Sequence, residues 1–392
     1  MPTRNILRLS RQWFSSNRGG LKPYCNRLSP RNQSTYMKKI AIFCHNFFSN
    51  GTVKVALSQA EVLQEAEQDV HLFVFHKEGD FMPPENVTIH YLYDAGQKPS
   101  LQEQRQRLQA KVAEAEQSGK FSLFLSNSTD CDVVVSGCDF DPCYYFCHCA
   151  LKQELLMELK RGPVHFWRRW KKAKALIGKK IITVSNGIAD ELRATSWLKP
   201  QSVQTIYNPF RLEEIRKKTQ EEIAEIPSEP YMIHVGRVTR QKRHDILFKA
   251  LRDMPTAPKL VLLCNRPKKA RKLAKKYGVE HRIITPGFQH NPYAWIAKAE
   301  LMLLSSDFEG LPTVVIESLA CGTPVVSTDC PHGPNEILTG HLAQYLVPVR
   351  QPALLAQKAL ECLASPPALD NLEILKAVDS QYIAAQYINL VI

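Results

Sequence analysis

LMLLSSDFEGLPTVVIESLACGTPVVST, residues 301–328, has the pattern of a strand, a loop, a short helix and a second strand. The apolar run at 301–304 is typical of a buried parallel strand, and a second strand begins at Pro324. Pro312 is expected at the first helical position, where a missing N–H costs no hydrogen bond. Gly322 is expected just after the helix, where a left-handed backbone favours a residue without Cβ. The stretch therefore predicts a β–α–β unit.

Two glutamates accompany this unit, Glu309 in the loop and Glu317 inside the helix. Helical side chains tilt toward the N-terminus, so Glu317 is expected to lean back toward Glu309. Backbone N–H groups from about Gly310 to Thr313 attract an anion such as a phosphate, and carboxylates accept hydrogen bonds from sugar hydroxyls. The alternative is an ordinary β–α–β unit whose glutamates are solvated or cap the helix.

The order of motifs in this stretch resembles a family signature. Glu309-Gly310-Leu311-Pro312, then Glu317, then Ala320-Cys321-Gly322-Thr323-Pro324-Val325-Val326 is similar to the signature of the retaining nucleotide-sugar glycosyltransferases of family 4. The resemblance extends to bacterial enzymes that build the lipopolysaccharide or lipooligosaccharide core. It implies the GT-B fold, an α/β architecture of two Rossmann-like domains whose parallel sheets face a cleft.

The rest of the chain fits that architecture, because from Ile40 it alternates short apolar strands with amphipathic helices. In the first half, strands are expected at 40–44, 70–75, 87–92, 121–125, 132–136, 144–148 and 180–184. The predicted parts are a basic disordered extension at 1–36, an acceptor-side domain at 37–210, a linker at 211–230, a nucleotide-sugar-binding domain at 231–368, and a helix at 369–392 that crosses back to the first domain.

Composition narrows the class of protein. A chain of 392 residues that is 44% hydrophobic can bury two cores, and it has no run of eighteen apolar residues that would predict a transmembrane helix. The net charge of the chain is +13, and residues 1–36 contribute +7 of it, because they include seven basic residues and no acidic one. That segment is expected to have little function, and a mitochondrial transit peptide is the alternative. The eleven cysteines follow no signal peptide, so we expect reduced thiols in the cytoplasm.

The loop that opens the second domain, GRVTRQKR at 236–243, has four cations that could neutralise a diphosphate. Gly236 allows close approach, and Arg237 could bind a phosphate through two nitrogens. In the resembling family an Arg and a Lys at the positions of Arg237 and Lys242 hold the donor diphosphate. A solvated basic loop is the alternative. Phe288 follows a later strand and resembles a residue that contacts the nucleotide base.

Two places in the first domain are expected to face the same cleft. Gly51 and Thr52 precede a helix, where a glycine lets the backbone approach a phosphate or an acceptor sugar. His148 ends a predicted strand, where a parallel sheet presents residues to its ligand crevice. In the resembling family a histidine at a like position contacts the donor sugar or the acceptor hydroxyl. The alternatives are an ordinary turn and a core histidine.

No metal site is predicted. Cysteines crowd around His148, at Cys138, Cys143, Cys147 and Cys149. They form no CxxC pair, and alternation along a strand would direct neighbouring ligands to opposite faces. Asp139-Phe140-Asp141 imitates the metal-binding DxD motif of another glycosyltransferase fold, whose single-domain architecture the rest of the chain does not suggest.

The segment 160–180, KRGPVHFWRRWKKAKALIGKK, is basic and contains no acidic residue. Phe166, Trp167 and Trp170 interleave with its cations, a pattern that suits the surface of an anionic membrane. A basic outer helix with a Trp anchored in the core is an equal alternative. Nucleic-acid binding is not predicted, because no nucleic-acid motif accompanies the charge.

The resemblance implies transfer of a sugar from a nucleotide diphosphate to an acceptor hydroxyl with retention of configuration, without metal or other cofactor. Arg237 and Lys242 would stabilise the departing diphosphate. Glu309, with the N–H groups of Gly310 and Leu311, would hold the donor sugar, and Glu317 would hold the ribose. The first candidate is N-acetylglucosamine transferred from its UDP donor to a lipid-linked core oligosaccharide at the cytoplasmic face of a bacterial inner membrane.

Three other interpretations stay open. One is transfer of galactose or glucose to a surface polysaccharide, and another is a non-catalytic GT-B protein that binds a nucleotide sugar or serves a partner transferase. A nicotinamide-dependent oxidoreductase would also explain β–α–β units. It should show GxGxxG after the first strand, and that fingerprint is absent after Cys44.

Overall fold

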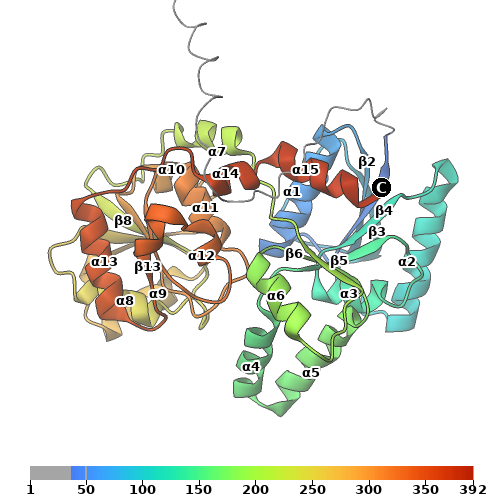
Figure 1. Ribbon diagram of the computed structural model, residues 1–392, viewed down its shortest axis with the longest axis horizontal. Helices are drawn as coiled ribbons and strands as arrows, with labels where there is room; N and C mark the ends of the chain where they lie inside the picture. Colours follow the sequence, from blue (N-terminus) through green and yellow to red (C-terminus); the bar gives the residue numbers. More distant parts are fainter. Residues whose placement is uncertain (1–36, 49–50, 392) are drawn as a thin grey trace, which may run out of the picture. The chain divides into compact units, whose positions relative to one another are not determined.

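Two parallel sheets form the framework of the chain, with helices packed around each (Figure 1). The computed structural model describes residues 37–48 and 51–391. The first sheet has the strand order β3-β2-β1-β4-β5-β6-β7, and the second has β10-β9-β8-β11-β12-β13. Neighbouring strands of both sheets run parallel throughout the described residues. The predicted extension at 1–36 lies outside the described residues.

The first half of the chain carries the seven-stranded sheet. Its elements are β1 (Lys39–Cys44), α1 (Gly51–Glu65), β2 (Asp69–Lys77), β3 (Thr88–Asp94), α2 (Leu101–Ala115), β4 (Leu123–Ser126), α3 (Thr129–Val135), β5 (Cys143–Cys147), α4 (Leu151–Arg161), α5 (Pro163–Ala173), β6 (Lys180–Thr183), α6 (Asn186–Ala194), β7 (Ser202–Thr205) and α7 (Leu212–Thr219).

The second half carries the six-stranded sheet and the C-terminal helices. Its elements are β8 (Tyr231–Val235), α8 (His244–Arg252), β9 (Lys259–Leu263), α9 (Pro267–Lys276), β10 (Ile283–Gly287), α10 (Tyr293–Ala297), β11 (Leu301–Leu304), α11 (Thr313–Ala320), β12 (Val325–Thr328), α12 (Pro334–Ile337), β13 (Leu346–Val347), α13 (Pro352–Ala364), α14 (Glu373–Ala377) and α15 (Ser380–Ile388).

Each sheet contains a point where the order of its strands reverses. In the first sheet β1 pairs with both β2 and β4, and in the second β8 pairs with both β9 and β11. The connections that leave the two neighbouring strands at such a point go to opposite faces of the sheet. A crevice therefore opens between them at the carboxyl ends of the strands. The segments after β1, β4, β8 and β11 are therefore the ones that the fold offers to a ligand.

Both faces of the first sheet are buried, as the apolar strands predict. On one face Ile40 and Ile42 pack in one core cluster with Ala56 of α1 and with Ile383 of α15. On the other face Phe43 packs in the core cluster that includes α2 and α3. The C-terminal helix thus completes the core of the first half.

The C-terminal segment is two helices instead of the single helix expected at 369–392. The chain turns at Val378, whose carbonyl accepts the Phe210 N–H at 2.8 Å, and Asp379 caps α15. Helix α15 then packs on α1, where Gln59 Nε2 donates to the Tyr387 hydroxyl at 3.0 Å. This pairing attaches the end of the chain to the first sheet.

The strand predicted at 132–136 is wrong, because these residues belong to helix α3. The run of three valines imitates a buried strand. Ser128 precedes it and accepts the Cys131 N–H with its side chain, and Asp130 and Asp132 lie in the first turn. A side-chain cap and acidic residues at the N-terminus both stabilise a helix, and here they outweigh the β preference of valine.

Three smaller differences concern segment boundaries. Pro312 is the residue that precedes α11, so it lies one position before the expected one, whereas Gly322 adopts the expected left-handed backbone with φ +82°. The predicted linker at 211–230 contains helix α7. The basic segment at 160–180 is divided, because α4 ends at Arg161, Gly162 follows it and Pro163 begins α5.

Candidate active site

A cavity of about 710 Å³ is lined by the segments that follow strands of both sheets. The first half contributes residues after β1, β4 and β5 and from the start of α1, and the second half contributes residues after β8 and β11. These include both points of strand reversal. A volume of roughly 300–1,000 Å³ is usual for small-molecule sites.

Most residues predicted from the sequence line this cavity. They are Gly51, Thr52, His148, Gly236, Arg237, Lys242, Glu309, Gly310, Leu311, Pro312 and Thr313. Glu317 and Phe288 are not among its lining residues. The structure thus brings together segments that are up to 262 positions apart in the chain, counted from Gly51 to Thr313.

The wall from the second half is built around the ion pair of Lys242 and Glu309. Lys242 Nζ lies 2.7 Å from Glu309 Oε1, and the Ser306 hydroxyl donates to the same oxygen at 2.5 Å. Gln241 Nε2 donates to the Phe308 carbonyl at 2.8 Å and lies 3.4 Å from Glu309 Oε2. Because both members of the pair are mostly buried, the carboxylate and the ammonium are held in place before any ligand arrives.

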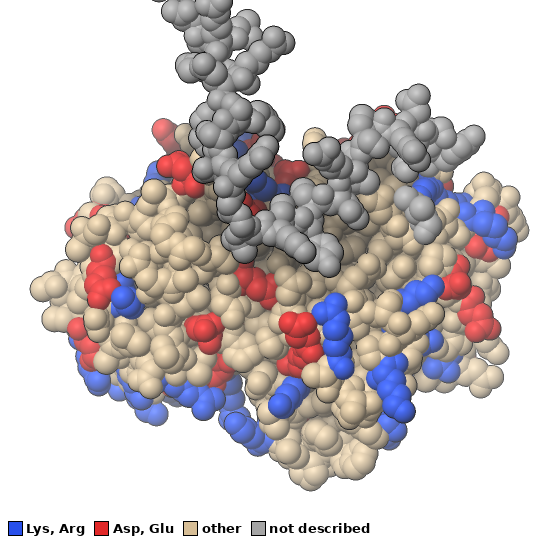
Figure 2. Space-filling model, viewed as in Figure 1, with Lys and Arg blue, Asp and Glu red and all other residues tan. Residues whose placement is uncertain are grey.

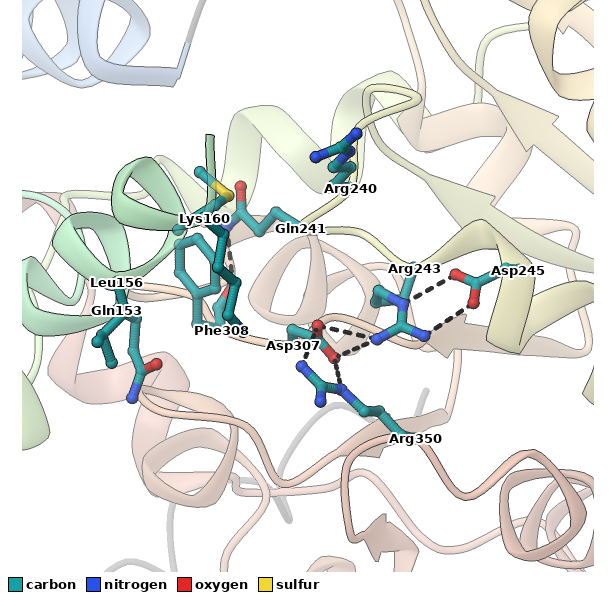
Figure 3. A pocket seen from close by; sticks show the side chains of 11 residues that line it. Gln153, Leu156, Lys160, Arg240, Gln241, Arg243, Asp245, Asp307, Phe308 and Arg350 are labelled. Atoms are coloured by element: carbon teal, nitrogen blue, oxygen red, sulfur yellow. Dashed lines mark hydrogen bonds and ion pairs between the residues drawn. The ribbon is translucent and has the colours of Figure 1, made fainter. Parts of the chain in front are cut away.

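The four cations of the loop 236–243 do not all serve this cavity. Arg237 and Lys242 line it, and the Arg237 guanidinium has no bonded partner in the described part of the chain. Arg240 and Arg243 instead line a neighbouring cavity, shown in Figure 3. Two of the four cations, Arg237 and Lys242, are therefore placed to meet a ligand in the larger cavity.

The wall from the first half presents polar atoms that lack partners among the described residues. They are His45 Nδ1, Asn127 Nδ2 and Oδ1, His148 Nε2 and Asn208 Oδ1. Burial lowers the pKa of His148 to about 4, so its imidazole is neutral near pH 7 and acts as a hydrogen-bonding group. A buried polar atom without a partner is costly, so a hydrogen-bonding group brought to these side chains would be stabilising.

Sequence reasoning missed three of these residues. His45 follows β1, Asn127 follows β4, and Asn208 lies shortly after β7. The rule that selected His148, a polar residue at the carboxyl end of a parallel strand, would have selected His45 and Asn127 as well.

Glu317 is buried but its carboxylate faces a different partner. Lys54 Nζ of α1 lies 2.7 Å from Glu317 Oε1, and the Tyr293 hydroxyl lies 3.5 Å from the same oxygen. Burial would lower the pKa of the Lys54 ammonium, but the attraction of Glu317 outweighs it and raises that pKa. Glu309 lines the larger cavity, and Glu317 does not.

Phe288 lies on the surface. Its side chain is 58% exposed, and its ring meets the His290 ring edge-on with centroids 5.3 Å apart. It lines neither of the two cavities described here.

The two halves touch beside the cavity. A Cβ placed on Gly310 would lie 1.9 Å from the His148 carbonyl oxygen, so only glycine fits between the two loops. Nearby, the Glu336 carboxylate accepts the backbone N–H groups of Asn186 and Gly187 at 2.8 Å each, which caps helix α6. These contacts fix the loop that carries Glu309 against the first half.

Within residues 37–48 and 51–391 there is no group of three or more His, Cys, Asp or Glu side chains arranged to hold a metal ion. The ten cysteines of that part of the chain are all free thiols. In the same part, no helix is long and apolar enough to cross a membrane.

Sequence comparison points to glycosyltransferases. Residues 215–374 match the family model described as "Glycosyl transferases group 1". Over 159 residues, 40% of this chain and 43% of the relative, the sequence is 35% identical to N-acetylgalactosamine-N,N'-diacetylbacillosaminyl-diphospho-undecaprenol 4-alpha-N-acetylgalactosaminyltransferase of Campylobacter jejuni. It is 28% identical over 178 residues to the lipopolysaccharide 1,6-galactosyltransferase of Escherichia coli K12, covering 42% of this chain and 47% of that protein. The aligned part spans less than half of the length of these relatives.

Solved structures extend the likeness to both halves. Sucrose-phosphate synthase from Thermosynechococcus elongatus superposes with a TM-score of 0.71 and 19% identity, covering 90% of this chain and 98% of that one. Anabaena HepE in complex with UDP and glucose superposes with a TM-score of 0.64 and 17% identity, covering 90% and 97%. The predicted fold class is thus confirmed: the chain has the two-sheet α/β fold of GT-B glycosyltransferase structures, and its residues 215–374 match the group 1 family of glycosyl transferases.

Proposed function

We propose that this chain is a glycosyltransferase that transfers a sugar from a nucleotide diphosphate to a hydroxyl group of a lipid-linked glycan, with retention of anomeric configuration. One observation carries the proposal. A single cavity has two cations and a fixed carboxylate on one wall and unpartnered polar side chains on the other. The first wall suits a diphosphate and a sugar, and the second suits sugar hydroxyls.

Each group has a role in that reaction. Arg237 and Lys242 stabilise the negative charge that develops on the leaving diphosphate, because preorganised cations in a partly buried site need little reorganisation. Glu309 orients the donor sugar through its hydroxyls, together with the backbone N–H groups of Gly310 and Leu311. His148 hydrogen-bonds a sugar hydroxyl from the opposite wall. Two side-chain cations meet the charge of the diphosphate, so the proposal assigns no metal or other cofactor.

The choice of nucleotide and sugar in this proposal is based on the family resemblance more than on the residues that line the cavity. A UDP-sugar is the proposed donor, with N-acetylglucosamine as the first candidate sugar. The Campylobacter relative is named for transfer of N-acetylgalactosamine and the Escherichia coli relative for transfer of galactose, so these sugars are the competing candidates. The proposed acceptor is a lipid-linked core oligosaccharide of the lipopolysaccharide type.

The hairpin of α4 and α5 supports the assignment of a lipid-linked acceptor. Leu156, Leu159, Val164 and Trp167 are 43–60% exposed on it, next to the exposed cations Lys160, Arg161 and Arg168. On the one face that Figure 2 shows, the lower end of this hairpin is mostly uncharged, with Lys and Arg side chains above it. We propose that it rests on an anionic membrane surface, at the cytoplasmic face of a bacterial inner membrane.

Replacing Trp167 with alanine is expected to weaken binding to phosphatidylglycerol-containing vesicles by about tenfold, because the variant loses apolar area that inserts at the interface. Co-sedimentation with vesicles measures the effect. Tyr382 is an equally exposed aromatic residue on α15, and Tyr382→Ala is the matched control. Equal binding by the wild type to neutral phosphatidylcholine vesicles would contradict an electrostatic contribution.

The enzyme class is tested by turnover of a donor panel, UDP-GlcNAc, UDP-GalNAc, UDP-galactose and UDP-glucose together with GDP- and ADP-sugars. One UDP-sugar is expected to be hydrolysed or transferred in the presence of EDTA. Arg237→Ala and Glu309→Ala are expected to lower that turnover by at least about 100-fold, the usual cost of removing one transition-state contact. Arg252→Ala and Glu300→Ala, which change exposed residues outside the cavity, are the matched controls.

The other outcomes separate the alternatives. Binding of a UDP-sugar without turnover, even with membrane extract as acceptor, would favour the non-catalytic partner subunit. Absence of any nucleotide-sugar binding would overturn the proposal.

A further inference from the structure

A second cavity, of about 430 Å³, is shown in Figure 3, and Gln241 lines both it and the first cavity. Helix α4 contributes one wall through Gln153, Leu156, Met157 and Lys160. The second half contributes the other walls through Arg240, Gln241, Arg243, Asp245, Asp307, Phe308 and Arg350. None of the residues that have a role in the proposed reaction lines this cavity.

The floor of this cavity is a rigid and internally neutral cluster. Asp307 accepts two hydrogen bonds from Arg243 at 3.0 and 3.1 Å and two from Arg350 at 2.9 and 3.1 Å. Arg243 also forms two bonds of 2.8 Å to Asp245. Figure 3 shows Asp307 held between the two guanidinium groups. Two arginines and two aspartates compensate each other here, so this cluster supplies shape and hydrogen-bond geometry and little net charge.

The remaining cations of the cavity are not compensated. Lys160 and Arg240 line it from opposite halves of the chain, and neither forms an ion pair or side-chain hydrogen bond with any residue in the described ranges. Two cations without acidic partners leave the cavity with a local charge of about +2. Such a charge attracts a phosphate or diphosphate, and the arginine can bind two phosphate oxygens at once.

The cavity is adjacent to both the proposed reaction site and the proposed membrane surface. Gln241 lines both cavities, and Phe308 of the second cavity directly precedes Glu309 of the first. On the opposite side Leu156 and Met157 line it, and Leu156 belongs to the exposed apolar surface of the α4–α5 hairpin. A molecule bound there would have an apolar region on one side and the donor sugar on the other.

We propose that this second cavity binds the phosphate or diphosphate group of an amphiphilic acceptor, with Lys160 and Arg240 as its ligands. The inference rests on the proposed function, because it names the charged group of the acceptor that this function requires. The lipid chain would follow α4 toward the membrane, and the glycan would pass Gln241 to reach the donor sugar. An acceptor without the charged group would then bind weakly and be positioned poorly.

Farnesyl diphosphate, a soluble amphiphile with a diphosphate, is the probe, and farnesol is its uncharged counterpart. Binding to the full chain is measured by calorimetry in the presence of 1 mM UDP, so that the diphosphate cannot occupy the donor cavity. The variant Lys160→Ala/Arg240→Ala is expected to bind farnesyl diphosphate at least about tenfold more weakly, because it lacks both side chains that would form charge-assisted hydrogen bonds to the diphosphate. Its affinity for UDP is expected to equal that of the wild type.

The control is Lys152→Ala/Arg252→Ala, which removes the same charge from α4 and α8 outside the cavity.

Equal binding of farnesyl diphosphate by the wild type and the Lys160→Ala/Arg240→Ala variant would overturn the inference. An equal loss for farnesol would also overturn it, because the cavity would then recognise only the apolar chain. A loss of binding to phosphatidylglycerol vesicles without a loss for farnesyl diphosphate would assign the two cations to membrane headgroups instead. Failure of UDP to bind the wild type would contradict the proposed function separately, and the farnesyl diphosphate comparison would still be informative.

Discussion

Replacing Lys242 with methionine is expected to lower the turnover of the nucleotide-sugar donor by about 100-fold to 1,000-fold, the range found when one preorganised transition-state contact is removed. The ammonium lies 2.7 Å from Glu309 Oε1 and lines the cavity beside Arg237. Methionine keeps the length of the side chain but cannot offset the charge that develops on the departing diphosphate. The rate constant for donor turnover at saturating donor measures the effect.

The same substitution also affects stability. It leaves the Glu309 carboxylate, 9% exposed, without its cation, and breaking a largely buried pair costs roughly 3–5 kcal/mol in the free energy of unfolding. Adding Glu309→Gln removes the unpaired charge, so the double variant is expected to recover stability and to remain inactive. Lys249→Met on helix α8 is the control for loss of a lysine outside the cavity. Turnover by Lys242→Met within threefold of the wild type would contradict the role assigned to the ammonium.

Replacing Gly310 with alanine is expected to reduce both turnover and stability. The added Cβ would lie 1.9 Å from the His148 carbonyl oxygen and 2.7 Å from its carbonyl carbon, so the backbone of one loop must move. Overpacking of this kind costs about 1–3 kcal/mol, and the shift displaces Glu309, the preceding residue, from its contacts with Lys242 and Ser306. Turnover is expected to fall by at least about 100-fold, because a displacement of about 1 Å at a positioned group has effects of that size.

Thermal unfolding and donor turnover check this prediction together. Gly51→Ala is the control for the unfolding measurement, since a Cβ at Gly51 meets no atom within 4 Å and its position begins helix α1. Gly310→Ala with an unfolding midpoint and a turnover like those of the wild type would show that the two loops do not need their close contact.

Much of the fold could be predicted because its signals are local. The strand expected at 301–304 has the same bounds in the structure, and Gly322 has the left-handed backbone that its position after a helix requires. A buried parallel strand is recognisable from a short apolar run, and a helix exit from a single glycine. The strand predicted at 132–136 was wrong because its apolar run is equally compatible with a helix, and the deciding cap at Ser128 lies outside the run.

For the site, local sequence patterns were enough to identify the residue types that follow the strand ends. They are Arg237 and Lys242 after β8, Glu309 after β11 and His148 after β5. How these groups are distributed between sites depends on the packing of the two sheets. This packing directs Arg240 to a second cavity and pairs Glu317 with Lys54, 263 positions away. Local backbone geometry determines that a side chain lies at the end of a strand, and this can be recognised in the sequence. The residue that this side chain contacts depends on how the two sheets pack together, which no local pattern encodes.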